Sequence, residues 1–121
     1  MNRMRTAGVT ALFAALLLTA CTSPQGGTDV SGKWGSTDPG QPNLIVNSDG
    51  SYSGSDGCNT MTGKGTISGN TIELGTVAMT QKQCSDVDTW MSKAEKGTVD
   101  GNIMTMYDSS GKSIGRLDRN D

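Results

Sequence analysis

The most chemically reactive side chains of this chain are its three cysteines, Cys21, Cys58 and Cys84. A cysteine thiolate can be alkylated, can bind a metal and can exchange with a disulfide. The sequence contains no histidine, so it lacks the Ser-His-Asp and Cys-His pairs that activate nucleophiles and the usual zinc ligand sets. The cysteines therefore favour attachment and cross-linking over catalysis. We expect no enzyme activity and no catalytic, cofactor-binding or metal-binding residues.

Cys21 follows a segment that has the composition of a secretory signal. Arg3 and Arg5 precede an apolar run from Val9 to Leu18, which is shorter than the roughly 20 residues that a membrane-spanning helix needs. The segment Leu18-Thr19-Ala20-Cys21 resembles the bacterial lipobox, whose cysteine takes a diacylglycerol group and becomes the first mature residue. We therefore predict a lipoprotein signal peptide over residues 1–20 and lipidation of Cys21. A plain secreted protein with an incidental cysteine is the alternative.

The residues after Cys21 are polar and small, and we predict that residues 21–30 form a flexible tether. Two acyl chains such as palmitate anchor a protein durably, because each buried methylene contributes about 0.8 kcal/mol. We expect a protein anchored to a membrane: to the extracytoplasmic face of the cell membrane, or to the outer membrane of a double-membraned host. Removing Arg3 and Arg5 with the signal changes the net charge from −2 to −4. Because the remaining chain has no basic cluster, we expect no nucleic-acid partner.

Cys58 and Cys84 are left as a pair if Cys21 is lipidated, and the compartment outside the cytoplasmic membrane permits their oxidation. The chain is 33% hydrophobic and has 17 glycines. A small domain of this kind buries a limited core and often needs a cross-link. A Cys58–Cys84 disulfide would contribute roughly 3.5 kcal/mol on the chain-entropy account. Two free, buried cysteines remain the alternative.

Oxygen-bearing side chains gather between residues 47 and 56, and calcium is the ion that such ligands suggest. The four candidates are Asn47, Asp49, Ser51 and Asp56. The glutamate that completes an EF-hand loop is absent, and the spacing fits a hairpin turn instead. We therefore predict a turn here and no metal.

Short strands separated by turns make up most of the remaining pattern. Strands are expected around residues 33–34, 43–47, 51–54, 63–68, 71–74, 77–80, 98–99, 103–107 and 112–117, and residues 118–121 are expected to form a polar tail. Hairpin turns are expected at Asp49-Gly50 and Gly69-Asn70. Helical spacing appears once: Val87, Trp90, Met91 and Ala94 fall at i, i+3, i+4 and i+7. Ser85 could cap a helix that contains them. The pattern predicts an α+β, mainly β fold: an antiparallel meander with one late helix over about 85–96.

The segment Asp56-Gly57-Cys58-Asn59, followed by Gly63, resembles the META domain family of HslJ-like bacterial proteins. The resemblance runs from about residue 32 to residue 117. It includes Trp34 in a Gly-x-Trp opening, the turn region 49–54, and a threonine four residues before Cys84. It implies a domain over residues 31–118 that forms a curved antiparallel sheet or half-open barrel crossed by a helix.

The resemblance implies a class of role and no reaction, because members of this family mostly have no assigned biochemical function. Some are linked to heat or antibiotic stress. We expect a non-enzymatic envelope lipoprotein with a stress-related binding or assembly role and an envelope protein as its partner. One alternative is a carrier of an apolar small ligand, in a groove lined by Trp34, Tyr52, Trp90 and Tyr107. Another is an inhibitor of a wall-degrading enzyme such as lysozyme, whose positive charge an acidic domain would complement.

Overall fold

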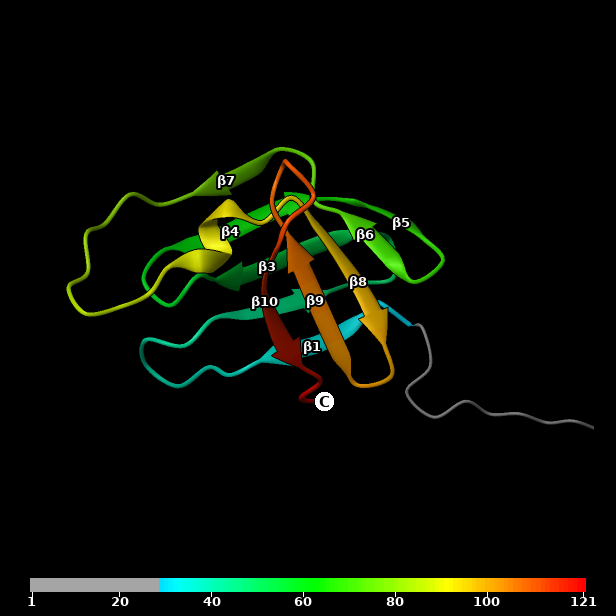
Figure 1. Ribbon diagram of the computed structural model, residues 1–121, viewed down its shortest axis with the longest axis horizontal. Helices are drawn as coiled ribbons and strands as arrows, with labels where there is room; N and C mark the ends of the chain where they lie inside the picture. The colour runs from blue at the N-terminus through cyan, green and yellow to red at the C-terminus, as the bar shows by residue number, and fades with distance from the viewer. Residues whose placement is uncertain (1–28) are drawn as a thin grey trace, which may run out of the picture.

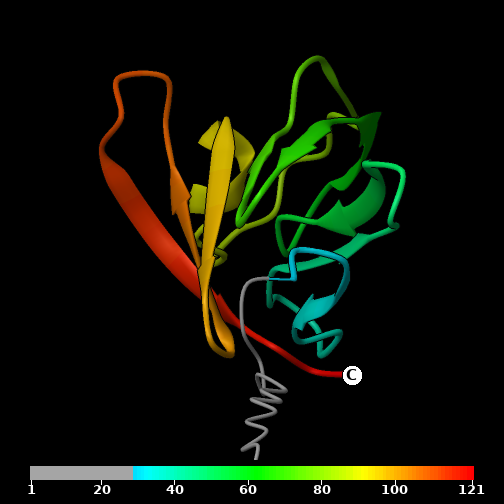
Figure 2. The same ribbon diagram turned by 90° about the vertical axis from the view of Figure 1, so that its right-hand side faces the viewer.

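The computed structural model describes residues 29–121, so the predicted signal peptide, Cys21 and the tether as far as residue 28 lie outside the described residues. The described chain folds into two five-stranded antiparallel sheets (Figures 1 and 2). The strand order is β1-β2-β3-β4-β7 in the first sheet and β10-β9-β8-β6-β5 in the second. The prediction of a mainly β, antiparallel domain is confirmed. Over residues 29–121 the sheets do not close into a barrel.

The strand bounds are β1 Gly32–Gly35, β2 Asn43–Val46, β3 Ser51–Ser55, β4 Thr60–Lys64, β5 Thr66–Ser68, β6 Thr71–Glu73, β7 Val77–Met79, β8 Lys96–Asp100, β9 Ile103–Tyr107 and β10 Ser113–Asp118. Among residues 29–121 a single 3-10 turn, η1, spans Trp90–Lys93. In the described part of the chain, no helix has the length and apolar character needed to span a bilayer.

The strands form where apolar residues alternate with polar or exposed ones. In β2, Leu44 and Val46 are buried and Ile45 between them is exposed, as the two-residue period of a strand requires. The predicted turn at Asp49-Gly50 joins β2 to β3, and Gly50 there has a φ of +93°. The predicted turn at Gly69-Asn70 joins β5 to β6. Both turns are where the sequence places them.

One long hairpin connects the two sheets. Its first arm is β4 and β5, and its second arm is β6 and β7. Between the pairs Gly63↔Val77 and Thr66↔Glu73 the first arm advances three residues and the second four, so one extra residue bends the hairpin. The bend interrupts the strand predicted over 63–68 at Gly65, where a Cβ would lie 2.5 Å from the carbonyl oxygen of Glu73. The hairpin thereby belongs to the first sheet at one end and to the second at the other.

The predicted helix over about 85–96 is wrong, because this segment contains only the four-residue turn η1. Ser85 does not cap it; the residue before η1 is Thr89, which makes no side-chain cap bond. Asp86 has a φ of +58°, which a right-handed helix excludes. The disulfide at Cys84 and the pairing of Lys96 with β6 hold the two ends of the segment. The apolar spacing therefore indicates which side chains are buried or half-buried, and it does not indicate a helix.

The core is formed by side chains from both sheets and from η1. Tyr52 donates its hydroxyl to the Leu74 carbonyl at 2.9 Å, and burial raises the pKa of this tyrosine. Trp34 donates its indole N–H to the Val30 carbonyl, also at 2.9 Å, so both aromatic residues bury their rings and satisfy their polar ends. The buried apolar residues are Val30, Trp34, Leu44, Val46, Tyr52, Met61, Ile72, Leu74, Met91, Ala94, Val99, Met104, Met106 and Leu117.

The two sheets also meet through the ends of the described chain. The backbone of Arg119 bridges to that of Trp34, and the Asn120 N–H donates to the Lys33 carbonyl at 2.7 Å. The Arg119 guanidinium lies 4.1 Å from the centroid of the Trp34 ring and donates to the carbonyls of Asp29 (2.7 Å) and Ser31 (3.3 Å). The last residues, which the sequence suggests are a polar tail, therefore fasten β10 to β1.

Candidate functional site

The loop that carries the Asp-Gly-Cys-Asn motif connects β3 to β4; we call residues 55–60 the motif loop. Asp56 Oδ1 accepts hydrogen bonds from the N–H groups of Cys58 (2.8 Å) and Asn59 (2.6 Å). This is an Asx turn, which an aspartate forms with backbone groups two residues on. Gly57 has a φ of +99°, and a Cβ there would lie 2.8 Å from the Gly40 carbonyl oxygen. The motif therefore encodes a tight turn that needs a carboxylate and a glycine at adjacent positions.

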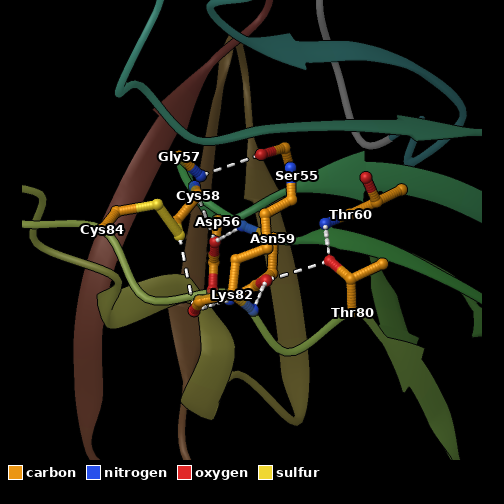
Figure 3. Close-up of a disulfide and its surroundings, with 9 residues drawn as sticks. All are labelled: Ser55, Asp56, Gly57, Cys58, Asn59, Thr60, Thr80, Lys82 and Cys84. Atoms are coloured by element: carbon orange, nitrogen blue, oxygen red, sulfur yellow. Dashed lines mark hydrogen bonds between the residues drawn. A yellow bond between two sulfur atoms is a disulfide. The ribbon is translucent and has the colours of Figure 1, made fainter.

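Asn59 attaches the motif loop to the chain after β7, and Figure 3 shows its amide facing the Lys82 backbone. The Lys82 N–H donates to Asn59 Oδ1 at 2.6 Å, and Asn59 Nδ2 donates to the Lys82 carbonyl at 3.2 Å. The Thr80 hydroxyl donates to the same Oδ1 at 2.9 Å and accepts from the Thr60 N–H at 3.0 Å. The side-chain amide thus takes the place of a peptide group and extends the β4–β7 ladder by side-chain bonds.

The predicted disulfide between Cys58 and Cys84 is present, with a Cα–Cα distance of 5.9 Å, within the usual range for disulfides. It closes a sequence separation of 26 residues. Cys84 is exposed and Cys58 is half-buried. Cys58 Sγ lies 3.7 Å from the Lys82 carbonyl oxygen (Figure 3), a contact without a hydrogen bond because a disulfide sulfur carries no proton. We call residues 80–89, which Cys84 joins to the motif loop, the bridged segment.

Asp56 is the one buried charged residue among those that the structure describes, with 1% of its surface exposed. Its Oδ1 organises the turn, whereas its Oδ2 is buried and has no hydrogen-bond partner within residues 29–121. Leaving a buried acceptor unpaired costs stability. Asp56 therefore holds the motif loop through one oxygen only.

An open depression of about 390 Å³ adjoins the disulfide. Its lining mixes the motif loop with the bridged segment and is formed by Cys58, Asn59, Lys82, Gln83, Cys84, Ser85, Val87 and Thr89. The depression offers amide, hydroxyl and ammonium groups beside a disulfide. These groups suit hydrogen bonding to a partner, and the reactive bond beside them is the disulfide.

The structure brings four of the motif residues together and leaves two elsewhere. Asp56, Gly57, Cys58 and Asn59 share the motif loop. Gly63 lies farther along β4, where a Cβ would be 2.7 Å from Tyr52 Cζ, so this glycine makes room for the tyrosine. Trp34 is a core residue, 1% exposed.

The residues considered for calcium do not converge. Asp49 Oδ1 accepts from the Ser51 hydroxyl (2.6 Å) and the Ser51 N–H (2.9 Å), and these bonds hold the pKa of the Asp49 carboxyl below its ordinary value of 3.8. Asn47 belongs to the same turn, but Asp56 follows the far end of β3. From Asp29 onward, no group of three or more acidic, cysteine or histidine side chains is arranged to hold a metal.

Lys82 and Arg119 are structural contributors that sequence reasoning missed. Lys82 acts through its backbone N–H and carbonyl, which leave no signal in the residue type. Arg119 follows the last predicted strand in a run of charged and polar residues, where nothing in the sequence separates it from an exposed arginine. Only the position of Trp34 beneath its guanidinium does so.

The motif loop and the bridged segment lie at one end of the molecule. In Figure 1, the chain enters β1 toward one end of the long axis, whereas the chain that follows β7 projects at the other. The loop between β1 and β2 reaches the same end: a Cβ on Gly57 would contact Gly40 and Val87. We call this end, formed by residues 36–42, the motif loop and the bridged segment, the distal end.

Comparisons with curated proteins and with solved structures return no match. A model of the META domain family matches residues 22–121, which is 100 of the 121 residues. The match covers the two sheets, the motif loop, the bridged segment and the closing residues around Arg119. The chain therefore belongs to the META domain family.

Proposed function

We propose that this protein is a non-enzymatic envelope lipoprotein, anchored through acyl chains on Cys21, that binds or helps assemble an envelope protein through the distal end of its META domain. The observation that carries the proposal is that the point where the chain enters β1 and the family motif lie at opposite ends of the molecule. The chain enters β1 toward one end of the long axis, and the connections that carry the motif loop (β3 to β4) and the bridged segment (after β7) lie at the other (Figure 1). An anchor that precedes Asp29 would leave the distal end facing away from the membrane.

The attachment of the first described residues supports this arrangement. Val30 is 1% exposed in the core, and Arg119 donates to the carbonyls of Asp29 and Ser31. The chain is thus fastened to the domain where a tether would join it. A tether would therefore leave the domain at a fixed point, away from the distal end.

The chemistry of the motif loop supports binding over turnover. The Asn59 amide is occupied by Thr80 and Lys82, and Asp56 Oδ1 by two backbone N–H groups. Groups that satisfy one another in this way hold the motif loop rigid. Rigid surfaces lose little conformational entropy when a partner binds. A stress-related role follows from the family resemblance alone.

Two measurements in cells test the proposal. Labelling with an alkyne-bearing fatty acid should mark the wild-type protein and should not mark Cys21→Ala. A photo-crosslinking residue at Gln83, exposed at the distal end, should capture a specific envelope protein. The matched control is the same residue at Ser48, exposed in the turn between β2 and β3, which should capture much less.

Each part of the proposal can fail separately. Unlabelled wild-type protein would overturn the anchor. Equal capture from Gln83 and Ser48, or capture from neither, would overturn the distal binding surface. Turnover of a wall substrate that disappears in a single carboxylate variant would overturn the non-enzymatic role.

A further inference from the structure

We propose that the Cys58–Cys84 disulfide is a thiol–disulfide exchange site at which a dithiol attacks Cys84 Sγ, and that its reduction releases residues 83–88 while both sheets remain folded. The proposal concerns residues 29–121 only. It does not depend on the membrane anchor or on a partner at the distal end.

The disulfide is the main attachment of the bridged segment between Lys82 and Thr89. Within the described chain, residues 83–88 form a local turn at Ser85 and Asp86, and no hydrogen bond or ion pair joins them to another part of the molecule. All of them except Val87 are exposed. Apart from the bridge, the half-buried Val87 side chain is what holds this stretch, next to Gly40 and Gly57. A segment with few contacts and few hydrogen bonds opens at low free-energy cost.

The two sulfurs differ in accessibility. Exchange requires an incoming thiolate to reach one sulfur while the other leaves. Cys84 is exposed and lies in a stretch with no hydrogen bond to the rest of the domain. Cys58 is half-buried, and its Sγ faces the Lys82 carbonyl oxygen at 3.7 Å. Because an incoming thiolate reaches the more exposed cysteine more easily, attack is favoured at Cys84.

The exchange is balanced in two steps. The first thiolate of the dithiol bonds to Cys84 Sγ, the Cys58–Cys84 bond breaks, and Cys58 leaves as a thiolate that takes up a proton. The second thiol of the dithiol loses its proton and attacks the first sulfur of the same dithiol in the mixed disulfide. The bond to Cys84 Sγ breaks, and Cys84 leaves as a thiolate that takes up a proton. The dithiol is oxidised by two electrons to a disulfide, and the bridge is reduced by two electrons to two thiols.

Release should stop at both ends of the segment. Toward the N-terminus, Lys82 stays paired with the Asn59 amide. Toward the C-terminus, the Trp90 ring packs on Gly115 of β10, where a Cβ would lie 2.6 Å from the ring, and Met91 is fully buried. Asp86, held at a φ of +58°, would be free to leave a region that non-glycine residues avoid. The disulfide is in no strand pair, so the ladders do not depend on it.

Limited reaction with glutathione identifies the sulfur that is attacked. Oxidised protein is exposed briefly to glutathione at neutral pH, quenched with acid, alkylated and mapped by mass spectrometry. Because the peptides that carry Cys21, Cys58 and Cys84 are distinguished, the mixed disulfide can be located. We expect glutathione on Cys84 at least about ten-fold more often than on Cys58, by the access dependence of exchange. Equal modification, or more on Cys58, would overturn the assignment.

Limited proteolysis and hydrogen exchange together test the release. The oxidised protein, the protein reduced with dithiothreitol, and the variant Cys58→Ser/Cys84→Ser are compared. Because residues 83–88 have no hydrogen bond to the rest of the domain, their amides exchange fast in every form. Cleavage by a dilute endoprotease that cuts before aspartate, at Asp86 and Asp88, reports the release instead. We expect this cleavage to be at least about ten-fold faster in both bridge-free forms, while amides of β3, β4 and β9 keep their protection against exchange. Unchanged cleavage at Asp86 and Asp88 would overturn the proposal, and so would loss of protection throughout the sheets. Far-UV circular dichroism of the same samples distinguishes those two failures.

Discussion

Replacing Arg119 with alanine tests how strongly the end of the chain fastens the two sheets together. The Arg119 side chain is 16% exposed. It stacks on the Trp34 ring at 4.1 Å and donates to the Asp29 and Ser31 carbonyls at 2.7 and 3.3 Å. Its remaining contact is an ion pair with Asp121 at 3.9 Å. Alanine would remove all four contacts and leave the backbone in place.

The expected loss follows from these contacts. A hydrogen bond from a charged donor contributes about 1.5 kcal/mol, and a cation–π contact at a partly exposed site about 1 kcal/mol. The ion pair with Asp121 should add almost nothing, because it is long and exposed to solvent. Arg119 Nε is buried without a partner, a cost that alanine would relieve. Since such contributions are not additive, we expect the free energy of unfolding to fall by about 2 kcal/mol.

Urea unfolding followed by far-UV circular dichroism measures this loss. Arg116→Ala is the matched control, because Arg116 is an exposed arginine in β10, three residues before Arg119, and should change stability by less than about 0.5 kcal/mol. Arg119→Lys keeps the charge but loses the two-pronged donor, and we expect it to fall between alanine and the wild type. If Arg119→Ala and Arg116→Ala were equally stable, the closing residues would be a tail after all.

Three further predictions concern the motif loop and the turns. Asn59→Ala removes three hydrogen bonds to the chain after β7. It should lower the unfolding free energy by about 2 kcal/mol in urea titrations. A change below the fitting error would mean that this amide does not hold the bridged segment to the motif loop. Gly57→Ala should lower the unfolding free energy by about 3 kcal/mol, because a positive φ is combined with a Cβ 2.8 Å from a carbonyl oxygen. Gly111→Ala, at φ +87° with nothing within 4 Å of the added Cβ, should lower it by about 1 kcal/mol in the same assay. Equal losses would show that the close contact at Gly57 does not matter. Hydrogen bonds from Ser51 and Ser110 lower the pKa of the Asp49 and Asp108 carboxyls from 3.8. The two carboxylates therefore stabilise the fold above that pH, and this stabilisation is lost as the pH falls below it. The double variant Asp49→Asn/Asp108→Asn should lose less stability than the wild type between pH 5 and pH 2, and parallel pH curves would refute the assignment.

Local features of the sequence determined much of this protein. The alternation in β2 and the glycine-containing turns at 49–50 and 69–70 appear where the residues place them, because turn and strand geometry depend on neighbours along the chain. The pairing of Cys58 with Cys84 also follows from the sequence once Cys21 is assigned to lipid. The motif from Asp56 to Asn59 indicates the META family from the sequence alone, and the family match over residues 22–121 confirms it.

The tertiary structure decided what depends on contacts between distant residues. The helical spacing between Val87 and Ala94 is real, but the disulfide and the β6–β8 ladder hold both ends of that segment, so only η1 forms. The bend at Gly65 depends on the approach of the Glu73 backbone, and the role of Arg119 depends on a tryptophan 85 positions earlier. Residue type and spacing along the chain report local geometry and burial. They do not report which atoms of a distant strand occupy the neighbouring space. For that reason the predicted helix is a single 3-10 turn, and the predicted polar tail holds β10 against β1.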